Sequence, residues 1–139
     1  DESVAYFNLG AALANSGHGV EAAQRFLEAK ERYPVGSKNW AAATAATFDM
    51  LRMEECAEVA RPEWWNDEEL KALSVRIVRA APNEAVVLSM RADVLSGHCS
   101  DLWEAGPRSV AELKEAATCF DRSAALCSAP VWKAESSRL

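Results

Sequence analysis

The stretch NLGAALANSGHGVEAAQRFLEAKERYP, residues 8–34, decides how this chain folds. Two alanine-rich segments with apolar residues at helical spacing flank a short turn of glycine and small polar residues at positions 15–19. The residue before a proline avoids the α region, so the second segment is expected to end at Tyr33 and Pro34. The stretch therefore predicts two helices joined by a short turn, with a defined stop.

Residues 3–36 also share a spacing pattern with a known repeat. Gly10 and Ala22 are small at the points where two helices of a hairpin must approach closely. The full pattern is Tyr6-x2-Leu9-Gly10-x2-Leu13, then Ala22-x3-Phe26, then Pro34. This pattern closely resembles a tetratricopeptide repeat, whose unit of about 34 residues is a helical hairpin. The resemblance implies an all-α fold in which such hairpins stack into a right-handed solenoid.

A repeat predicts its own recurrence, and Trp40 lies one repeat length after Tyr6. The second unit, residues 37–82, is degraded, because Ala43 and Thr44 replace the Leu–Gly pair and Thr47 replaces a leucine. We expect the insert EECAEVARPEWW, residues 54–65, to prolong the first helix of this unit until Pro62. Its second helix is expected at residues 66–82, with an N-terminal cap formed by Asn66 and Glu69.

The third unit covers residues 83–130. Leu88-x2-Arg91-Ala92-x2-Leu95 keeps the spacing of a first helix, and Ala116-x3-Phe120 restores the second-helix signature after a long connection. Ser109 and Glu112 form a capping box. The second helix is predicted to have one apolar stripe, made of Val110, Leu113, Ala117, Phe120, Ala124 and Cys127. Pro130 is expected to end this helix, and residues 131–139 then form a capping or truncated helix.

Composition agrees with a single all-α domain over residues 1–139, with about three hairpin units. The chain has no long apolar run, so no transmembrane helix is expected. A net charge of −6 argues against a general nucleic-acid binder or a binder of anionic membranes, both of which need a basic patch. The absence of a methionine before Asp1 predicts a processed or excerpted chain.

The resemblance implies a non-catalytic adaptor or scaffold that binds a peptide or an amphipathic helix in a concave groove lined by first helices. The groove positions implied by the family are Phe7, Asn8, Ala11, Asn15, Lys38, Ala41, Ala42, Ala45, Phe48, Asp49, Val86, Met90 and Asp93. Well-known members grip a C-terminal carboxylate with basic and amide side chains. Here only Asn8 and Lys38 are polar donors near the matching positions, so binding of Hsp70 or Hsp90 tails is not expected. The alternative for Ala41, Ala42 and Ala45 is packing against the chain's own helices.

Two further sets of residues have alternative interpretations. Trp64, Trp65 and Trp103 lie in the two inserted segments, where tryptophan either contacts a partner or fixes the insert to the domain. We favour the second role. An alternative function also follows from these inserts: a structural subunit packed permanently in a larger assembly.

The sequence contains no phosphate-binding glycine loop, no nucleophile elbow and no C-x-x-C pair, so neither an enzyme nor a cofactor is expected. His98, Cys99 and Asp101 are a weak metal-ligand pattern without a second cluster. The cysteines are expected to be reduced core thiols, which favours an intracellular and most simply a cytoplasmic chain.

Overall fold

A computed structural model describes residues 2–97 and 102–138, with side chains up to residue 127. Every regular element in these parts of the chain is a helix and none is a strand, so the all-α prediction is confirmed. The elements are α1 (Glu2–Asn15), α2 (Gly19–Arg32), α3 (Lys38–Leu51), a short 3₁₀ helix η1 (Glu54–Cys56), α4 (Asp67–Ala80), α5 (Ala85–Ser96) and α6 (Val110–Arg138).

Local residue chemistry sets most helix boundaries. Tyr33, before Pro34, is extended with φ −68° and ψ 145°, and it ends α2 as predicted. The Ser37 hydroxyl accepts a hydrogen bond from the Trp40 amide at 3.1 Å and caps α3. At the end of α5, Gly97 has a left-handed φ of 69°, which glycine adopts without steric cost.

The predicted N-terminal caps are present at the starts of α4 and α6, and the one at α6 is a full capping box. The Asn66 side chain accepts from the Glu69 amide at 3.0 Å. Ser109 and Glu112 exchange both bonds, because the Glu112 amide donates to the Ser109 hydroxyl at 3.1 Å and the Ser109 amide donates to the Glu112 carboxylate at 2.8 Å.

Two predicted boundaries are wrong. α3 ends at Leu51, so the insert does not prolong it, and only η1 interrupts an irregular segment up to residue 66. The Arg61 side chain donates to the Leu51 carbonyl at 2.6 Å, which satisfies one of the orphan acceptors at the end of α3. Pro130 does not end a helix either, because α6 runs continuously from Val110 to Arg138.

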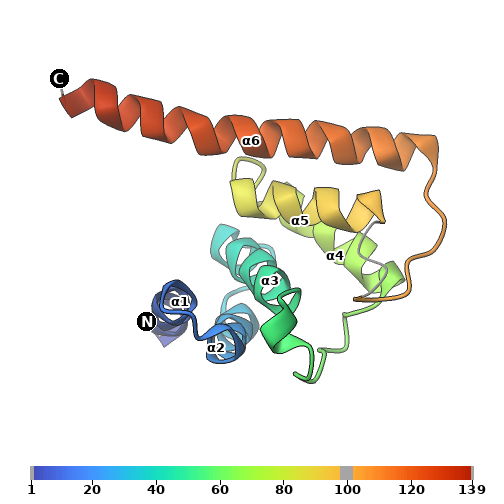
Figure 1. Ribbon diagram of the computed structural model, residues 1–139, viewed down its shortest axis with the longest axis horizontal. Coiled ribbons are helices and arrows are strands. Elements are labelled where there is room, and N and C mark those ends of the chain that lie inside the picture. The colour runs from blue at the N-terminus through green and yellow to red at the C-terminus, as the bar shows by residue number, and fades with distance from the viewer. Residues whose placement is uncertain (1, 98–101, 139) are drawn as a thin grey trace.

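The helices pack in chain order. Each one contacts the next along the chain, and α3 also contacts α5 (Figure 1). The α1–α2 hairpin is close-packed at Gly10, where an added Cβ would lie only 2.8 Å from the Phe26 ring. The main core lies between α2, α3, α4 and α5. It consists largely of alanine and aromatic side chains, because small residues let helices approach while the rings fill the remaining space.

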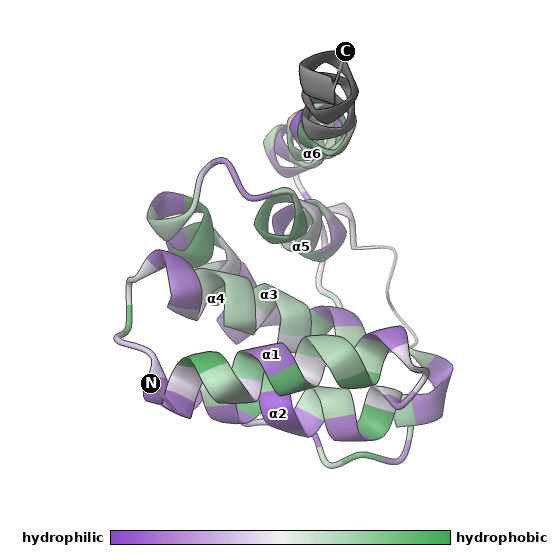
Figure 2. Cartoon of the chain, turned by 90° about the vertical axis from the view of Figure 1, so that its left-hand side faces the viewer, coloured by the Kyte–Doolittle hydropathy of each residue, from purple (hydrophilic) through white to green (hydrophobic). Residues whose placement is uncertain are grey.

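α6 packs against α5 with a different face from the one predicted. The residues it buries are the small ones Ala116, Cys119 and Ser123, and Ser123 shares a 2.8 Å hydrogen bond with Ser89 on α5. All six residues of the predicted apolar stripe are exposed. Figure 2 shows α6 above α5 at the edge of the molecule, with α1 and α2 on the opposite side.

Candidate functional site

The residues assigned to the groove fall into three groups by accessibility. The exposed ones are Asn8, Asn15, Lys38 and Asp49. The half-buried ones are Phe7, Ala11, Ala42 and Val86. The buried ones are Ala41, Ala45, Phe48, Met90 and Asp93. A partner can therefore reach the first two groups directly, and the third group serves the interior of the domain.

Ala41 and Ala45 are buried within the chain's own core. Their burial agrees with the alternative interpretation, in which the small side chains on α3 allow neighbouring helices to approach. Ala42 differs, because it remains half-accessible on the same helix. Of these three alanines assigned to the groove, only Ala42 keeps surface that a partner could touch.

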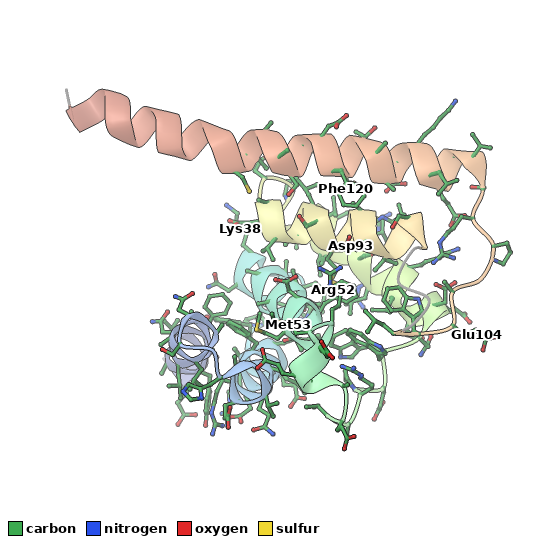
Figure 3. All side chains as sticks on the ribbon, viewed as in Figure 1. Lys38, Arg52, Met53, Asp93, Glu104 and Phe120 are labelled. Carbon is green, nitrogen blue, oxygen red and sulfur yellow. The ribbon has the colours of Figure 1, made fainter. Side chains whose placement is uncertain are left out.

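The two acidic residues of the predicted groove are engaged by one arginine. Arg52 donates to Asp93 on α5 at 2.8 Å and to Asp49 on α3 at 3.2 Å. Figure 3 shows Arg52 and Asp93 together between these two helices. The arginine thus joins the end of α3 to α5, and the charge of Asp93 is compensated inside the protein rather than offered to a ligand.

Phe48 lies at the centre of an aromatic cluster. Its ring centroid is 5.2 Å from that of Trp65 and 5.8 Å from that of Trp103. Both tryptophans are buried, and both indole nitrogens donate hydrogen bonds: Trp65 to the Leu102 carbonyl and Trp103 to Asp67, each at 3.0 Å. These two tryptophans therefore fix their inserts to the domain, as favoured from the sequence, and only Trp64 stays partly exposed.

Asp67 organises the second insert. Its carboxylate accepts hydrogen bonds from Arg108, from the Trp103 indole and from the Gly106 amide. The bond from Arg108 contributes most to holding the pKa of the Asp67 carboxyl well below its ordinary value. Arg108 also donates to the Leu95 and Val94 carbonyls at the end of α5. This cluster is structural, since it ties α4, α5 and the segment before α6 together.

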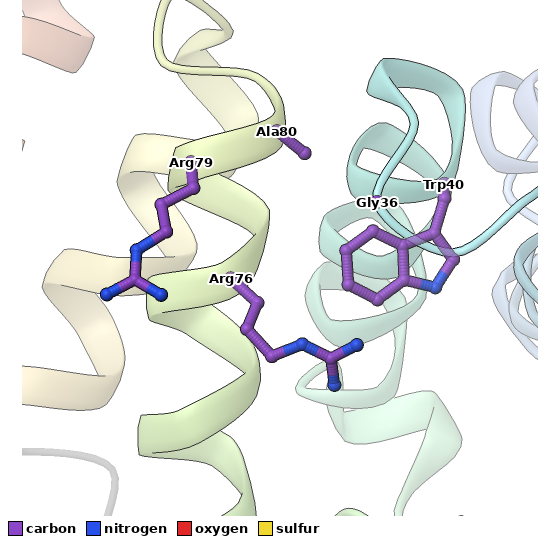
Figure 4. A pocket seen from close by; sticks show the side chains of 5 residues that line it. All are labelled: Gly36, Trp40, Arg76, Arg79 and Ala80. Carbon is purple, nitrogen blue, oxygen red and sulfur yellow. The ribbon is translucent and has the colours of Figure 1, made fainter.

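A cleft that the sequence did not reveal runs beside Trp40. Part of it is a cavity of about 270 Å³ lined by Gly36, Trp40, Arg76, Arg79 and Ala80 (Figure 4). The Arg76 guanidinium lies 5.3 Å from the Trp40 ring, and the Lys30 ammonium lies 5.4 Å from the Trp64 ring. Burial lowers the pKa of Lys30. Because helices distant in sequence form this cleft, no local motif predicts it.

α1 has an unusual surface for an outer helix. Its sequence is apolar on nearly every side, yet the helix buries only Ser3 and Gly10. Val4 is 42% exposed and Leu9 47% exposed. A helix that is apolar all round is normally enclosed by protein, so this surface is suited to contact with another polypeptide.

Two buried thiols have surroundings unsuited to nucleophilic chemistry. Burial raises the pKa of Cys56 and of Cys119, so both stay protonated near neutral pH. No group of three metal-ligating side chains lies within the part of the chain that the structure describes. The weak metal pattern at His98, Cys99 and Asp101 falls outside those residues. Over the described helices, none is long and apolar enough to cross a membrane.

Comparisons with known proteins return no match. No family model matches the chain, and no curated protein and no solved structure matches it significantly.

Proposed function

We propose that this chain is a non-catalytic protein-interaction module built from about three stacked tetratricopeptide-like hairpins. Support comes from the first hairpin, where buried Gly10 lies against the Phe26 ring at the position at which the repeat has its small residue. Support also comes from the order of packing, in which each hairpin contacts the next and α3 contacts α5. Units at residues 3–36, 37–82 and 83–130 form one domain in this proposal.

The observation that carries the proposal is the accessible apolar surface of α1. Val4 is 42% exposed, and Phe7 and Ala11 on the same face of the helix are half-buried. Exposed apolar area of this kind is stabilised by contact with a partner, because association removes it from water. Nothing in the helix's own hairpin covers it, since α1 packs against α2 through its Gly10 side.

The ligand is a peptide or an amphipathic helix that lies along the first helices. Ala42 and Val86 provide half-buried apolar contact on α3 and α5, and Asn8, Asn15 and Lys38 provide a polar rim. A C-terminal carboxylate is not the main determinant, because Asn8 and Lys38 are too few to grip it as the well-known carboxylate-binding members do. The burial of the Cys56 and Cys119 thiols supports a module without catalysis.

A second candidate function, a subunit fixed in a larger assembly, is favoured by the exposed stripe on α6. Sedimentation of the purified chain separates the two functions. Reversible binding of a ligand supports the adaptor, whereas permanent association with other chains supports the assembly subunit.

The test of the groove uses affinity capture from a lysate of the source organism with three forms of the chain. Proteins that the unmodified chain captures should be lost with Val4→Glu and with Ala42→Glu, because a carboxylate cannot be buried unpaired against an apolar ligand. A fourth form, Ala125→Glu, is the control, because Ala125 is an exposed helical position on α6, away from the groove. Equal capture by the unmodified chain and both groove variants would sink the groove proposal, provided that circular dichroism shows them all folded.

A further inference from the structure

Six exposed residues on α6 have the spacing of a coiled-coil seam. They recur at alternating intervals of three and four residues: Val110, Leu113, Ala117, Phe120, Ala124 and Cys127. Val110 is 69% exposed, Leu113 46% and Phe120 41%. We call this set the α6 seam. Val131 and Ala134 continue the same spacing in the sequence.

The α6 seam is separate from the contact with α5. α6 contacts α5 through its own residues Ala116, Cys119 and Ser123. An ion pair of 2.9 Å between Arg91 of α5 and Glu115 of α6 adds to this contact. With 3.6 residues per turn, the centre of the seam lies roughly 110° around the helix from that contact. The contact with α5 already contains a hydrogen bond and an ion pair, and the residues of the seam stay exposed beside it.

Comparison with α2 shows what α6 lacks. Both helices carry the Ala-x3-Phe signature of a second helix, beginning at Ala22 and at Ala116. α2 lies between α1 and α3, and the residue after its signature alanine, Ala23, is buried. In α6 the residue after the signature alanine is Ala117, which is exposed. One helical neighbour is therefore absent from α6 in the described chain.

We propose that the α6 seam pairs with the α6 seam of a second copy of this chain, in antiparallel orientation about a twofold axis. Side-chain size carries the first argument. When Phe120 faces Ala117 of the second copy, Leu113 faces Ala124 and Val110 faces Cys127. Every layer then combines a large residue with a small one, which is how facing helices interdigitate without cavities.

Charge carries the second argument. Lys114 and Asp121 are exposed on the same flank of the seam, and neither has an ion-pair partner within the described residues. Antiparallel pairing brings Lys114 of each copy beside Asp121 of the other, and the symmetry makes this contact twice. A parallel pair would instead place Phe120 against Phe120 and Ala117 against Ala117. Across a parallel pair Lys114 would face Ser109 and Asp121 would face Ala116, and neither of these residues has a charge.

The length of the seam sets the expected affinity. From Val110 to Cys127 the helix is roughly 27 Å long at 1.5 Å per residue. A single pair of helices of this length falls in the class of small interfaces below about 1,200 Å². We therefore expect weak, reversible association that depends on protein concentration.

Sedimentation equilibrium between roughly 1 and 500 μM tests the association, a range that brackets the affinity expected for so small an interface. The mass should rise from that of the 15.1 kDa chain to twice that value. Ala117→Glu and Phe120→Glu should remain monomeric throughout, whereas Ala125→Glu, exposed on another face of α6, should dimerise normally. A monomer at every concentration overturns the proposal. Dimerisation that survives Ala117→Glu and Phe120→Glu overturns it equally, because the contact then lies elsewhere.

Disulfide trapping tests the orientation. Val110→Cys should form a covalent dimer on mild oxidation, because the new thiol faces Cys127 of the second copy, and adding Cys127→Ser should abolish this dimer. Ala111→Cys, exposed next to the seam position, is the matched control and should not cross-link. A Cys127–Cys127 dimer in the unmodified chain indicates parallel pairing and overturns the antiparallel arrangement. The capture of groove ligands is measured in a separate experiment. The groove proposal and the dimer proposal can therefore each be refuted without the other.

Discussion

Replacing Gly10 with alanine tests the close contact at the centre of the first hairpin. In an exposed helix interior this substitution stabilises by about 1 kcal/mol, because alanine has the higher helix propensity. Here the added Cβ would lie 2.8 Å from Cδ1 and 2.9 Å from Cε1 of Phe26. Those atoms belong to a buried ring whose centroid is 5.3 Å from that of Phe7, so the ring cannot swing freely into solvent.

The expected net effect is destabilisation. Ordinary contact distances require the Phe26 ring and the new methyl group to separate by a further half ångström or more, and overpacking of this kind costs about 1–3 kcal/mol. Because the clash is with a buried ring, we take the upper part of this range, about 2–3 kcal/mol, and subtract about 1 kcal/mol for helix propensity; Gly10→Ala should then lower the free energy of unfolding by about 1–2 kcal/mol. For a domain of this size that corresponds to a fall in Tm of roughly 3–8 °C.

Thermal and urea unfolding followed by far-ultraviolet circular dichroism measure the effect. Asn8→Ala is the matched control, because Asn8 is exposed on the same helix and its replacement gains propensity without a clash. It should raise stability by a few tenths of a kcal/mol. A Gly10→Ala chain that is as stable as the unmodified chain, or more stable, would refute the close approach of α1 and α2.

Two further stability predictions concern the caps and ion pairs. Asp67→Asn should lower the free energy of unfolding by about 2–4 kcal/mol, because it leaves the Arg108 guanidinium, only 6% exposed, without its carboxylate. Since the folded state depresses the Asp67 pKa, this stabilisation is present above the ordinary carboxyl pKa of about 3.9 and is lost as pH falls below it. The free energy of unfolding of Asp67→Asn should therefore fall less steeply with decreasing pH than that of the unmodified chain. An unchanged slope would contradict the stabilising role of the Asp67 carboxylate. Ser109→Ala should cost about 1 kcal/mol through loss of the α6 cap, measured by urea unfolding, and an unchanged midpoint would show that the cap adds nothing.

The parts of the fold that the sequence predicted are those determined by short-range chemistry. Tyr33 ends α2 because Pro34 follows it, and Ser109 with Glu112 starts α6 because the two side chains satisfy each other's backbone amides. The close approach at Gly10 was also predictable, because a helical hairpin needs a small residue there. These features depend on residues within one hairpin.

The parts that the sequence missed depend on contacts between distant segments. Phe48 was expected to face a partner, but it packs on Trp65 and Trp103, which come from two different inserts. Thr47 interrupted the repeat pattern, yet it is fully buried because its hydroxyl donates to the Ala43 carbonyl at 2.8 Å. Because of this hydrogen bond, a polar side chain can be buried in the core. The spacing of apolar residues along the helix does not predict such a buried threonine.

The distribution of apolar surface along the chain favours association at both outer helices. On α1 the apolar side chains of Val4 and Leu9 are exposed, and on α6 those of Leu113 and Phe120 are exposed. Contact with another polypeptide would remove such surface from water. The two surfaces differ in kind, since only the α6 seam combines heptad spacing with alternating size and flanking opposite charges. A seam that matches itself is suited to a second copy, whereas the α1 surface has no such self-complementary pattern and is suited to a different partner. On this reasoning self-association through α6 and ligand binding along α1 can occur in the same molecule.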